Sequence, residues 1–312
     1  MLMTITISSS MCLMMNSWLM IWIMLEMNTF SFCFLVKTES KQKESSTEMS
    51  MKYFIIQSLS SALLLGSAVM TKTMFHFISS NLMSMSLMIK MAAAPFHKWF
   101  VLMIKKISWK MSSLLMTWQK LAPVYLVIFQ WKPLIFLFMI LTAWIGTIMQ
   151  MNKKSTAEIM SYSSIFNLSW MLLSIIINLK TMFTFSILYW SAVMIMMTLL
   201  FKSNMYIVDM EMIEQYSKFS YLVAIINLGG IPPSLGFLAK IMVVMESLKT
   251  SMLLMSTSLM IISSINMYIY LRMFNFMIIK STNKTQNLNK SKKLTDKIMI
   301  LVSLMPILIW CV

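Results

Sequence analysis

Apolar residues run through this chain in long stretches that short polar or basic segments interrupt. A helix needs about 20 apolar residues to cross the hydrocarbon core of a bilayer, and irregular backbone cannot face lipid. The pattern therefore predicts eleven membrane-spanning helices. It leaves open whether the polar pair Asn16-Ser17 is a tight turn or a step within one long helix. The predicted spans are about 2–15, 18–36, 52–72, 75–104, 111–130, 133–150, 156–177, 181–202, 217–249, 253–279 and 295–311.

The composition points in the same direction. Of the 312 residues, 59% are apolar and 12% are charged, against roughly 45–50% and about 25% in soluble domains. The small numbers of Gly (5) and Pro (6) exclude collagen-like and low-complexity chains, and a mean hydropathy of +0.77 excludes intrinsic disorder. We therefore expect an all-α polytopic membrane protein that forms a single membrane domain over residues 1–312.

The basic residues are distributed unevenly over the predicted topology. Eighteen of the 26 Lys and Arg fall in loops on the side of the N-terminus, four fall on the opposite side and four lie within spans. Such an excess over short loops marks the cytoplasm-like side, which is the matrix in a mitochondrion. The distribution also argues against nucleic-acid binding despite the formal net charge of +16, because the charges lie between apolar runs.

Four ionisable side chains lie deep within predicted spans: Glu26, Lys90, Lys120 and Lys240. Inserting each one costs at least about 2.5–3.5 kcal/mol, so each needs a reason. A buried amine near a carboxylate can change its protonation state near neutral pH when the carboxylate moves, which is what a proton relay requires. The alternatives are a structural ion pair between Glu26 and Lys90, and snorkelling of Lys120 and Lys240 to an interface. Arg272, nearer to the basic end, is expected to snorkel.

Two of the predicted spans contain residues that interrupt a helix. In the fourth, Pro95 lacks a backbone N–H and should kink or unwind the helix. The ninth contains the cluster Gly229, Gly230, Pro232 and Pro233. Both interruptions lie beside a buried lysine. Because protein or water must satisfy the freed carbonyls, both should lie in the interior, although simple structural kinks would give the same pattern.

The two interrupted spans are five apart in sequence, so they cross the membrane in opposite directions. This offset predicts inverted repeats at about residues 2–130 and 133–279, followed by a C-terminal helix at about 295–311. Such repeats, with sites at broken helices near the midplane, are typical of secondary transporters.

Seven segments in a defined order and spacing, over about residues 18–275, carry a resemblance to a known family. They are WIMLEMNTF, STEMSMKYFIIQS, IKMAAAPFHKW, LMTWQKLAPVYL, AEIMSYSSIFNLSW, NLGGIPPSLGFLAK and NMYIYLRM. Together they resemble NADH-ubiquinone oxidoreductase chain 2, the mitochondrially encoded antiporter-like subunits of respiratory complex I. The 41 Met residues fit an AT-rich mitochondrial genome that reads AUA as Met.

The resemblance implies roles for the buried charges. Glu26 and Lys90 would be the family's interacting carboxylate and lysine, Lys120 its central relay lysine, and Lys240 the lysine beside the second broken helix. Water chains between these groups would carry protons. His97 keeps the family's histidine and would serve either proton entry or loop packing. The chain departs from the family's usual residues at Lys98, Val101, Glu158 and Ala239.

On this resemblance we expect a core membrane-arm subunit of the proton-translocating NADH:ubiquinone oxidoreductase, in the mitochondrial inner membrane, with its N-terminus and basic loops in the matrix. Its partners would be other membrane-arm subunits, including neighbouring antiporter-like subunits, and membrane lipids.

We expect no cofactor or metal in this chain. The sequence has no dinucleotide fingerprint, and Cys12, Cys33 and Cys311 are too widely spaced for cluster ligation. NADH, FMN, iron–sulfur clusters and ubiquinone would then belong to partner subunits.

Two other functions remain open: a stand-alone cation/proton antiporter of the related family, and a structural subunit with vestigial charges. Uptake in proteoliposomes distinguishes the first, because a solitary antiporter exchanges Na⁺ for H⁺ without partners.

Overall fold

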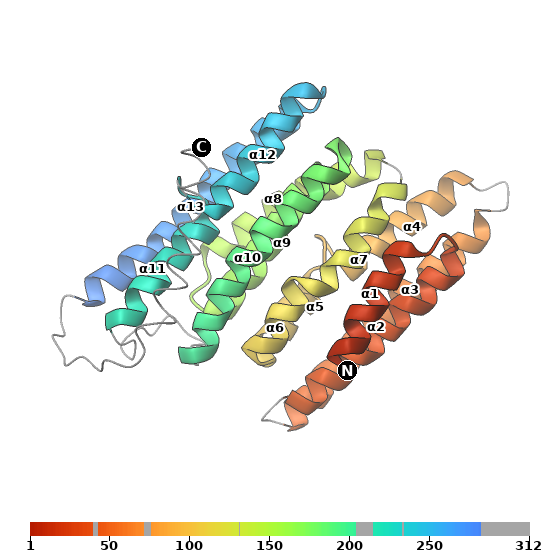
Figure 1. The fold of residues 1–312 in the computed structure, drawn as a ribbon, viewed down its shortest axis with the longest axis horizontal. Coiled ribbons are helices and arrows are strands. Elements are labelled where there is room, and N and C mark those ends of the chain that lie inside the picture. Colours follow the sequence, from red (N-terminus) through yellow and green to blue (C-terminus); the bar gives the residue numbers. More distant parts are fainter. Residues whose placement is uncertain (40–42, 72–75, 131, 204–214, 233, 282–312) are drawn as a thin grey trace. The chain divides into compact units, whose positions relative to one another are not determined.

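The computed structural model describes residues 1–39, 43–71, 76–130, 132–203, 215–232 and 234–281, and every element in these ranges is a helix (Figure 1). The all-helical fold class predicted from the sequence is therefore confirmed. The α-helices are α1 (Leu2–Met14), α2 (Trp18–Glu39), α3 (Lys43–Met70), α4 (His76–Lys90), α5 (Lys98–Lys106), α6 (Trp109–Met116), α7 (Trp118–Leu126), α8 (Lys132–Met151), α9 (Thr156–Ile177), α10 (Leu179–Ser203), α11 (Gln215–Gly229), α12 (Leu235–Lys249) and α13 (Leu253–Ser281). A short 3-10 helix, η1 (Val127–Phe129), follows α7.

Within the described ranges, six helices are long and apolar enough to cross a membrane: α2, α3, α8, α9, α10 and α13. Of the ten predicted spans that fall within the described ranges, α1 and these six each account for one. The other three are each built from a pair of shorter helices: α4 with α5, α6 with α7, and α11 with α12. The eleventh predicted span, 295–311, lies outside the described residues, so the count of eleven stays a prediction.

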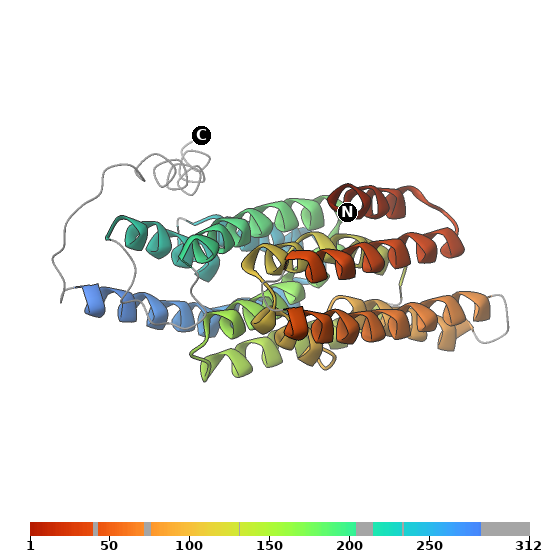
Figure 2. The same cartoon turned by 90° about the horizontal axis from the view of Figure 1, so that it is seen from below.

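The contacts divide the chain into two compact units, each with its own helix packing. The first unit comprises residues 1–146 and 164–176. Within it α2 packs against α1 and α3, and α3 packs against α4 and α5 (Figure 2). Of the described residues, the second comprises 147–163, 177–203, 215–232 and 234–281, where α12 packs against α10, α11 and α13. The predicted inverted repeats at 2–130 and 133–279 stay a prediction.

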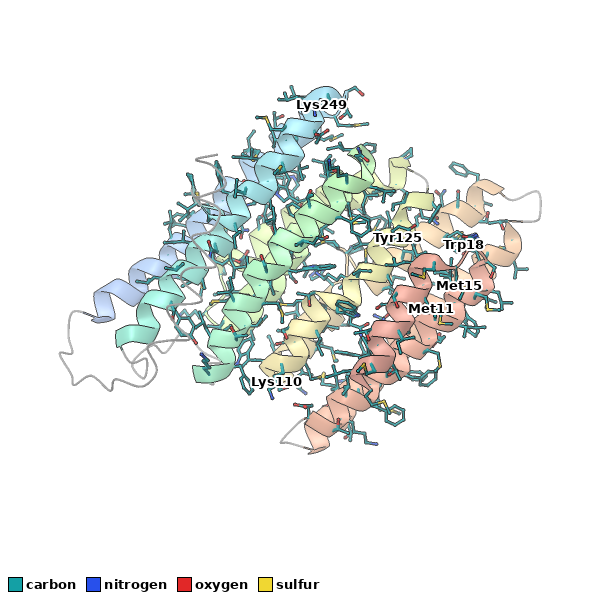
Figure 3. The ribbon with its side chains drawn as sticks, viewed as in Figure 1. Met11, Met15, Trp18, Lys110, Tyr125 and Lys249 are labelled. Atoms are coloured by element: carbon teal, nitrogen blue, oxygen red, sulfur yellow. The ribbon has the colours of Figure 1, made fainter. Side chains whose placement is uncertain are left out.

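The first two helices are separated by a tight turn (Figure 3). Met15, whose N–H donates to the carbonyl of Met11 at 3.1 Å, takes an extended conformation that ends α1. Trp18, which begins α2, packs edge-on against Phe129 with ring centroids 6.3 Å apart, and Phe129 also contacts Tyr125. The polar pair in this turn therefore separates two helices.

Candidate functional site

The fourth predicted span is interrupted beside Pro95, as its composition suggested. Helix α4 ends at Lys90 and α5 begins at Lys98. Between them Ala92 takes a left-handed conformation with φ of 59°, and the peptide bond before Pro95 is cis. Residues 91–94 are buried, and the N–H of Ala93 donates to the carbonyl of Met88 at 2.9 Å. The first part of the break is thus covered by protein, whereas Pro95 and Phe96 are exposed on the surface of the chain.

Lys90, the last residue of α4, is buried against helix α3. Its side chain is only 6% exposed. The Nζ atom donates to the backbone carbonyl of Gln57 at 3.3 Å, and the Gln57 amide donates back to the carbonyl of Lys90 at 3.4 Å. This two-way contact fastens the end of α4 to the middle of α3.

Glu26 contacts the same helix, α3, from α2. Its carboxylate accepts hydrogen bonds from the hydroxyl of Ser61 on α3 and, at 3.3 Å, from Thr29 on its own helix. The sequence placed this carboxylate beyond the reach of water, whereas the structure leaves it partly exposed on the surface of the chain. It makes no direct ion pair with Lys90. Instead the two charges bind Ser61 and Gln57, which lie one helical turn apart on α3.

Lys120 lies in a span that the sequence predicted as one helix, 111–130, and this prediction was wrong. The structure interrupts the span at Thr117, between α6 and α7. The Thr117 hydroxyl donates to the carbonyl of Ser113 at 2.8 Å, and Pro123 within α7 has no N–H for the carbonyl of Gln119. The helix is therefore interrupted just before Lys120, at a residue whose hydroxyl and N–H share the Ser113 carbonyl.

The Lys120 ammonium is held by a carbonyl and an aromatic ring. The residue is 3% exposed, and Nζ donates to the backbone carbonyl of Ser164 in α9 at 3.1 Å. The same atom lies 4.8 Å from the centre of the Phe100 ring, within range of a cation–π interaction. Snorkelling to an interface, which the sequence left open for this residue, does not occur.

Lys90 and Lys120 line one small internal cavity of about 20 Å³. Its other polar walls include Gln57, Asn28 and Gln119. The Asn28 amide donates to Gln119 at 2.9 Å and the Gln119 amide donates back at 3.2 Å, which joins α2 to α7. A polar cavity of this size holds about one water molecule. The cavity therefore brings two of the predicted relay lysines together at a site that can hold a water.

The three amides are functional candidates that the sequence reasoning missed. Gln57, Asn28 and Gln119 are all at most 8% exposed, and each lies in the middle of an apolar run. An uncharged amide within an apolar run is a weaker sign of a functional site than a charged residue is. Burying an amide without a hydrogen bond nevertheless costs free energy, so a buried amide also needs a partner.

The ninth predicted span is interrupted at its Gly and Pro residues. Helix α11 ends at Gly229 and α12 begins at Leu235. Gly230 takes a left-handed conformation with φ of 74°, which favours glycine, and Pro232 is exposed. Ser234 caps α12 by accepting a hydrogen bond from the N–H of Phe237 at 3.3 Å. Pro233 lies outside the described residues.

Lys240 places its ammonium against this second break. The side chain is 3% exposed, and a Cβ added to Gly230 would lie 2.9 Å from the Lys240 Nζ. A side chain at Gly230 would therefore displace the end of the Lys240 side chain, and the left-handed backbone there separately favours glycine. Lys240 belongs to the second compact unit, whereas Glu26, Lys90 and Lys120 belong to the first.

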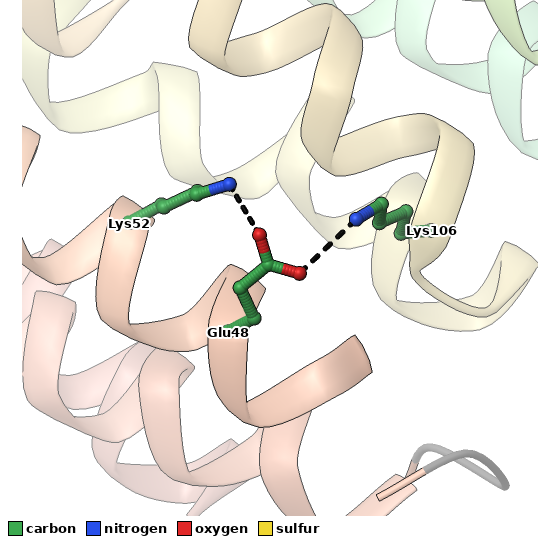
Figure 4. A network of polar contacts seen from close by, with 3 residues as sticks. All are labelled: Glu48, Lys52 and Lys106. Atoms are coloured by element: carbon green, nitrogen blue, oxygen red, sulfur yellow. Dashed lines mark hydrogen bonds and ion pairs between the residues drawn. The ribbon is translucent and has the colours of Figure 1, made fainter. Parts of the chain in front are cut away.

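The remaining predicted residues lie toward helix ends. His97 is 7% exposed and is the residue that precedes α5. Arg272, expected to snorkel, donates from Nη2 to the carbonyl of Lys153 at 3.3 Å. At the surface, Glu48 on α3 binds Lys52 of its own helix and Lys106 at the end of α5 (Figure 4). Within the described ranges, no three His, Cys, Asp or Glu side chains gather in a way that could hold a metal ion.

Comparisons with known proteins match most of the chain to one family. The family described as NADH:quinone oxidoreductase/Mrp antiporter, TM, matches residues 15–266. The chain is 34% identical to NADH-ubiquinone oxidoreductase chain 2 of Artemia franciscana, covering 82% of this chain and 81% of that protein. It is 33% identical to the protein of the same name from Locusta migratoria, covering 88% and 83%, and 32% identical to that of Anopheles gambiae, covering 86% and 80%.

Two solved structures share the fold. A chain of respiratory complex I from Thermus thermophilus, with bound aureothin, superposes with a TM-score of 0.82 at 17% identity, covering 96% of this chain and 74% of that one. A chain of the Mrp complex from Dietzia sp. gives a TM-score of 0.74 at 16% identity, covering 87% of this chain and 58% of that one.

Proposed function

The chain belongs to the NADH-ubiquinone oxidoreductase chain 2 family, and we propose that it is a core membrane-arm subunit of respiratory complex I that translocates protons across the mitochondrial inner membrane. Electron transfer from NADH to ubiquinone, with FMN and iron–sulfur clusters, takes place in partner subunits. The N-terminus and the basic loops face the matrix, which the distribution of Lys and Arg supports.

The shared cavity of Lys90 and Lys120 is the observation that carries this proposal. Two lysines that line a cavity for one water can exchange a proton through that water, because the water accepts a proton from one nitrogen as it passes another to the next. The amide pair of Asn28 and Gln119 holds the walls of the cavity in place. Apolar and aromatic side chains such as Leu25 and Trp99 complete the lining and limit the entry of further water.

Helix α3 is the part that couples the carboxylate to the first amine. Glu26 binds it through Ser61 and Lys90 binds it through Gln57, so a shift of α3 changes both contacts together. A conformational or electrostatic change in a neighbouring subunit moves α3. This movement weakens the hydrogen bond between the Lys90 ammonium and the Gln57 carbonyl. The proton then passes to Lys120 and onward to Lys240 in the second unit.

The test is a Lys120→Met variant in the assembled complex, with the proton-to-electron ratio measured in sealed vesicles. Met has about the length of the Lys side chain and resembles its apolar stem, but it lacks the ammonium group. Assembly of the complex, and NADH oxidation in uncoupled membranes, should therefore persist. We expect the ratio to fall by the share that one pumping subunit contributes. The matched control is Lys110→Met, which removes an exposed amine from α6 in the same unit and should leave the ratio unchanged. An unchanged ratio in the Lys120→Met complex would overturn the relay.

The fold shared with a chain of an Mrp complex keeps a second function in view, a cation/proton antiporter that works alone. The purified chain in proteoliposomes distinguishes the two. A solitary antiporter dissipates a proton gradient when Na⁺ is added, whereas a subunit of the complex shows no exchange. A third outcome, normal pumping when Lys90, Lys120 and Lys240 are all replaced by Met, would indicate a purely structural subunit.

A further inference from the structure

A groove of about 360 Å³ lies between α3 and α5 in the first compact unit. It opens to the surface of the chain, because Ile55 in one wall is 52% exposed and Leu102 in the other is 47% exposed. Its volume falls within the range of roughly 300–1,000 Å³ that is typical of ligand pockets. The apolar part of its walls consists of Met49, Ile55, Ile56, Leu102 and Met103.

Two exposed lysines line the same groove, Lys52 on α3 and Lys98 at the start of α5. Lys52 lies within the candidate membrane span Thr47–Met70. Lys98 lies about 12 Å along the helix from Lys106 at the other end of α5, at a rise of about 1.5 Å per residue. An ammonium group at such a position on the outside of a membrane protein is costly unless an anion accompanies it.

The carboxylate beside the groove does not balance this charge. Glu48 binds both Lys52 and Lys106, so one carboxylate serves two ammonium groups (Figure 4). Lys98 forms no ion pair within the part of the chain that the structure describes. An ammonium group has three donors, so Lys52 can bind a second anion while it keeps Glu48. The groove therefore attracts a negatively charged ligand.

Trp99 adds a hydrogen-bond donor to the groove. The residue is 9% exposed, and its indole N–H has no hydrogen-bond partner among the described residues. Its ring packs against the rings of Tyr53 and Phe100, with centroids 5.8 Å apart in both pairs. Buried polar groups in proteins almost always have a partner. The indole N–H therefore gives a second indication, independent of the lysines, that the groove holds a ligand.

We propose that this groove binds one phospholipid with an anionic headgroup, and we call it the α3–α5 lipid site. The phosphate lies on Lys52 and Lys98, an ester or phosphate oxygen accepts the indole N–H of Trp99, and one acyl chain covers the apolar walls. Basic pockets between membrane helices bind anionic headgroups in this way. A free phosphate ion would leave the apolar walls uncovered, so the combination of charge and apolar surface favours a lipid.

The lipid site shares a wall with the cavity of Lys90 and Lys120, because Tyr53 and Trp99 line both. Trp99 packs edge-on against Phe100, whose ring lies 4.8 Å from the Lys120 ammonium. A bound lipid therefore supports this aromatic wall from outside. The inference goes beyond the proposed function, since the lipid binds whether or not protons cross this chain.

The first experiment measures lipid binding in the assembled complex, placed in bilayers that contain phosphatidylglycerol with a photoactivatable acyl chain. Mass spectrometry of the irradiated complex should find the label on α3 and α5 along the groove. We expect Lys98→Gln to lower this labelling about five-fold, the contribution of one basic residue near an anionic lipid. The matched control is Lys105→Gln, which removes an exposed amine from the same helix outside the groove and should leave the labelling unchanged. Equal labelling of the two variants would overturn the site.

Two further comparisons test the headgroup and the indole separately. Phosphatidylcholine with the same acyl chain has a phosphate but no net charge, so it should label the groove less than phosphatidylglycerol does. Equal labelling by the two lipids would contradict an anionic site. Trp99→Phe keeps an aromatic ring but removes the N–H, so it should also lower the labelling by phosphatidylglycerol, and unchanged labelling would contradict the role of the indole.

The unmodified complex provides a test that does not depend on variants. A density map should show an acyl chain along the groove, with its headgroup between Lys52 and Lys98. A helix of another subunit seated there would overturn the lipid site even if every variant failed to assemble. The outcomes also separate the two proposals. Normal pumping by Lys120→Met contradicts the proposed function alone, whereas equal labelling of Lys98→Gln and Lys105→Gln contradicts the lipid site alone.

Discussion

The two units of this chain each place a buried lysine at a broken helix, but they satisfy the surrounding polar groups in different ways. In the first unit the amides bind protein: Asn28 pairs with Gln119, and Gln57 binds the backbone at Lys90. In the second unit the Asn266 amide has no hydrogen-bond partner among the described residues. A paired site has a fixed geometry, whereas an unpaired one depends on water. The first site therefore has a fixed hydrogen-bonding geometry, which the Asn266 amide of the second unit lacks.

The lysines also reach their helix ends by different routes. Lys90 is itself the last residue of α4, where the partial negative charge of a helix C-terminus favours a cation. Lys240 follows its break and reaches back to Gly230, one residue beyond the end of α11. Lys120 lies in the first turn of α7, the positive end of that helix, so its charge depends on the Ser164 carbonyl and the Phe100 ring. Lys120 is therefore stabilised by a carbonyl and an aromatic ring and not by a helix C-terminus.

The largest expected effect is from Gly236→Ala, which would collapse the second site. A Cβ at this position would overlap the backbone carbonyl of Asn227, and backbone cannot move aside as a flexible side chain can. Overpacking of this kind costs typically about 3 kcal/mol at the upper end of its usual range. We expect a lower yield of assembled complex and a clearly lower midpoint of thermal inactivation. The pairing in the first unit should be untouched.

Gly66→Ala is the matched control. Gly66 lies within α3, and no atom lies within 4 Å of the position of an added Cβ. Ala in a helix interior is more favourable than Gly by roughly 0.5–1 kcal/mol, so this variant should be as stable as the unmodified chain or slightly more so. If both variants lost stability equally, close packing at the second break could not be the cause.

A smaller effect should distinguish the paired amides from the unpaired ones. Asn28→Leu leaves the buried Gln119 amide without its partner, which costs about 1–3 kcal/mol. Asn266→Leu leaves no protein group unpaired and should cost much less. The shift in the midpoint of thermal inactivation of the complex measures both. The double variant Asn28→Leu with Gln119→Leu should recover most of the loss, because replacing both partners by apolar groups can be nearly neutral.

Much of the fold follows from the sequence because a bilayer restricts the chain so strongly. Long apolar runs can only be helices, and glycines and prolines mark the two breaks at Pro95 and Gly229. The interruption at Thr117 was missed because threonine is common inside helices. Its effect there arises from a hydroxyl that competes for the carbonyl of Ser113 and from a proline six residues later. The sequence alone does not show that these two residues act on the same stretch of helix.

Part of the candidate site could likewise be predicted from the sequence and part could not. A buried lysine can be found in a sequence, because its charge is costly wherever it lies in a span, and Lys90, Lys120 and Lys240 are all buried. Which groups meet depends on helix rotation and tilt, which no pattern along the chain specifies. The link between Glu26 and Lys90 through α3, and the amide pair across α2 and α7, therefore appear only in three dimensions.

The smallest expected effect comes from Glu48→Gln, which tests whether ion pairs outside the two sites matter. Glu48 joins Lys52 to Lys106, and all three side chains are 42% to 51% exposed (Figure 4). Exposed ion pairs gain little because water screens them and because ordering long side chains costs entropy. We expect no measurable change in the thermal inactivation midpoint or in the proton-to-electron ratio at physiological salt. A loss that appears here but disappears on adding salt would show that the fastening of α3 to the end of α5 is electrostatic, and that α3 then bears on the first site from its exposed end as well as from Ser61 and Gln57.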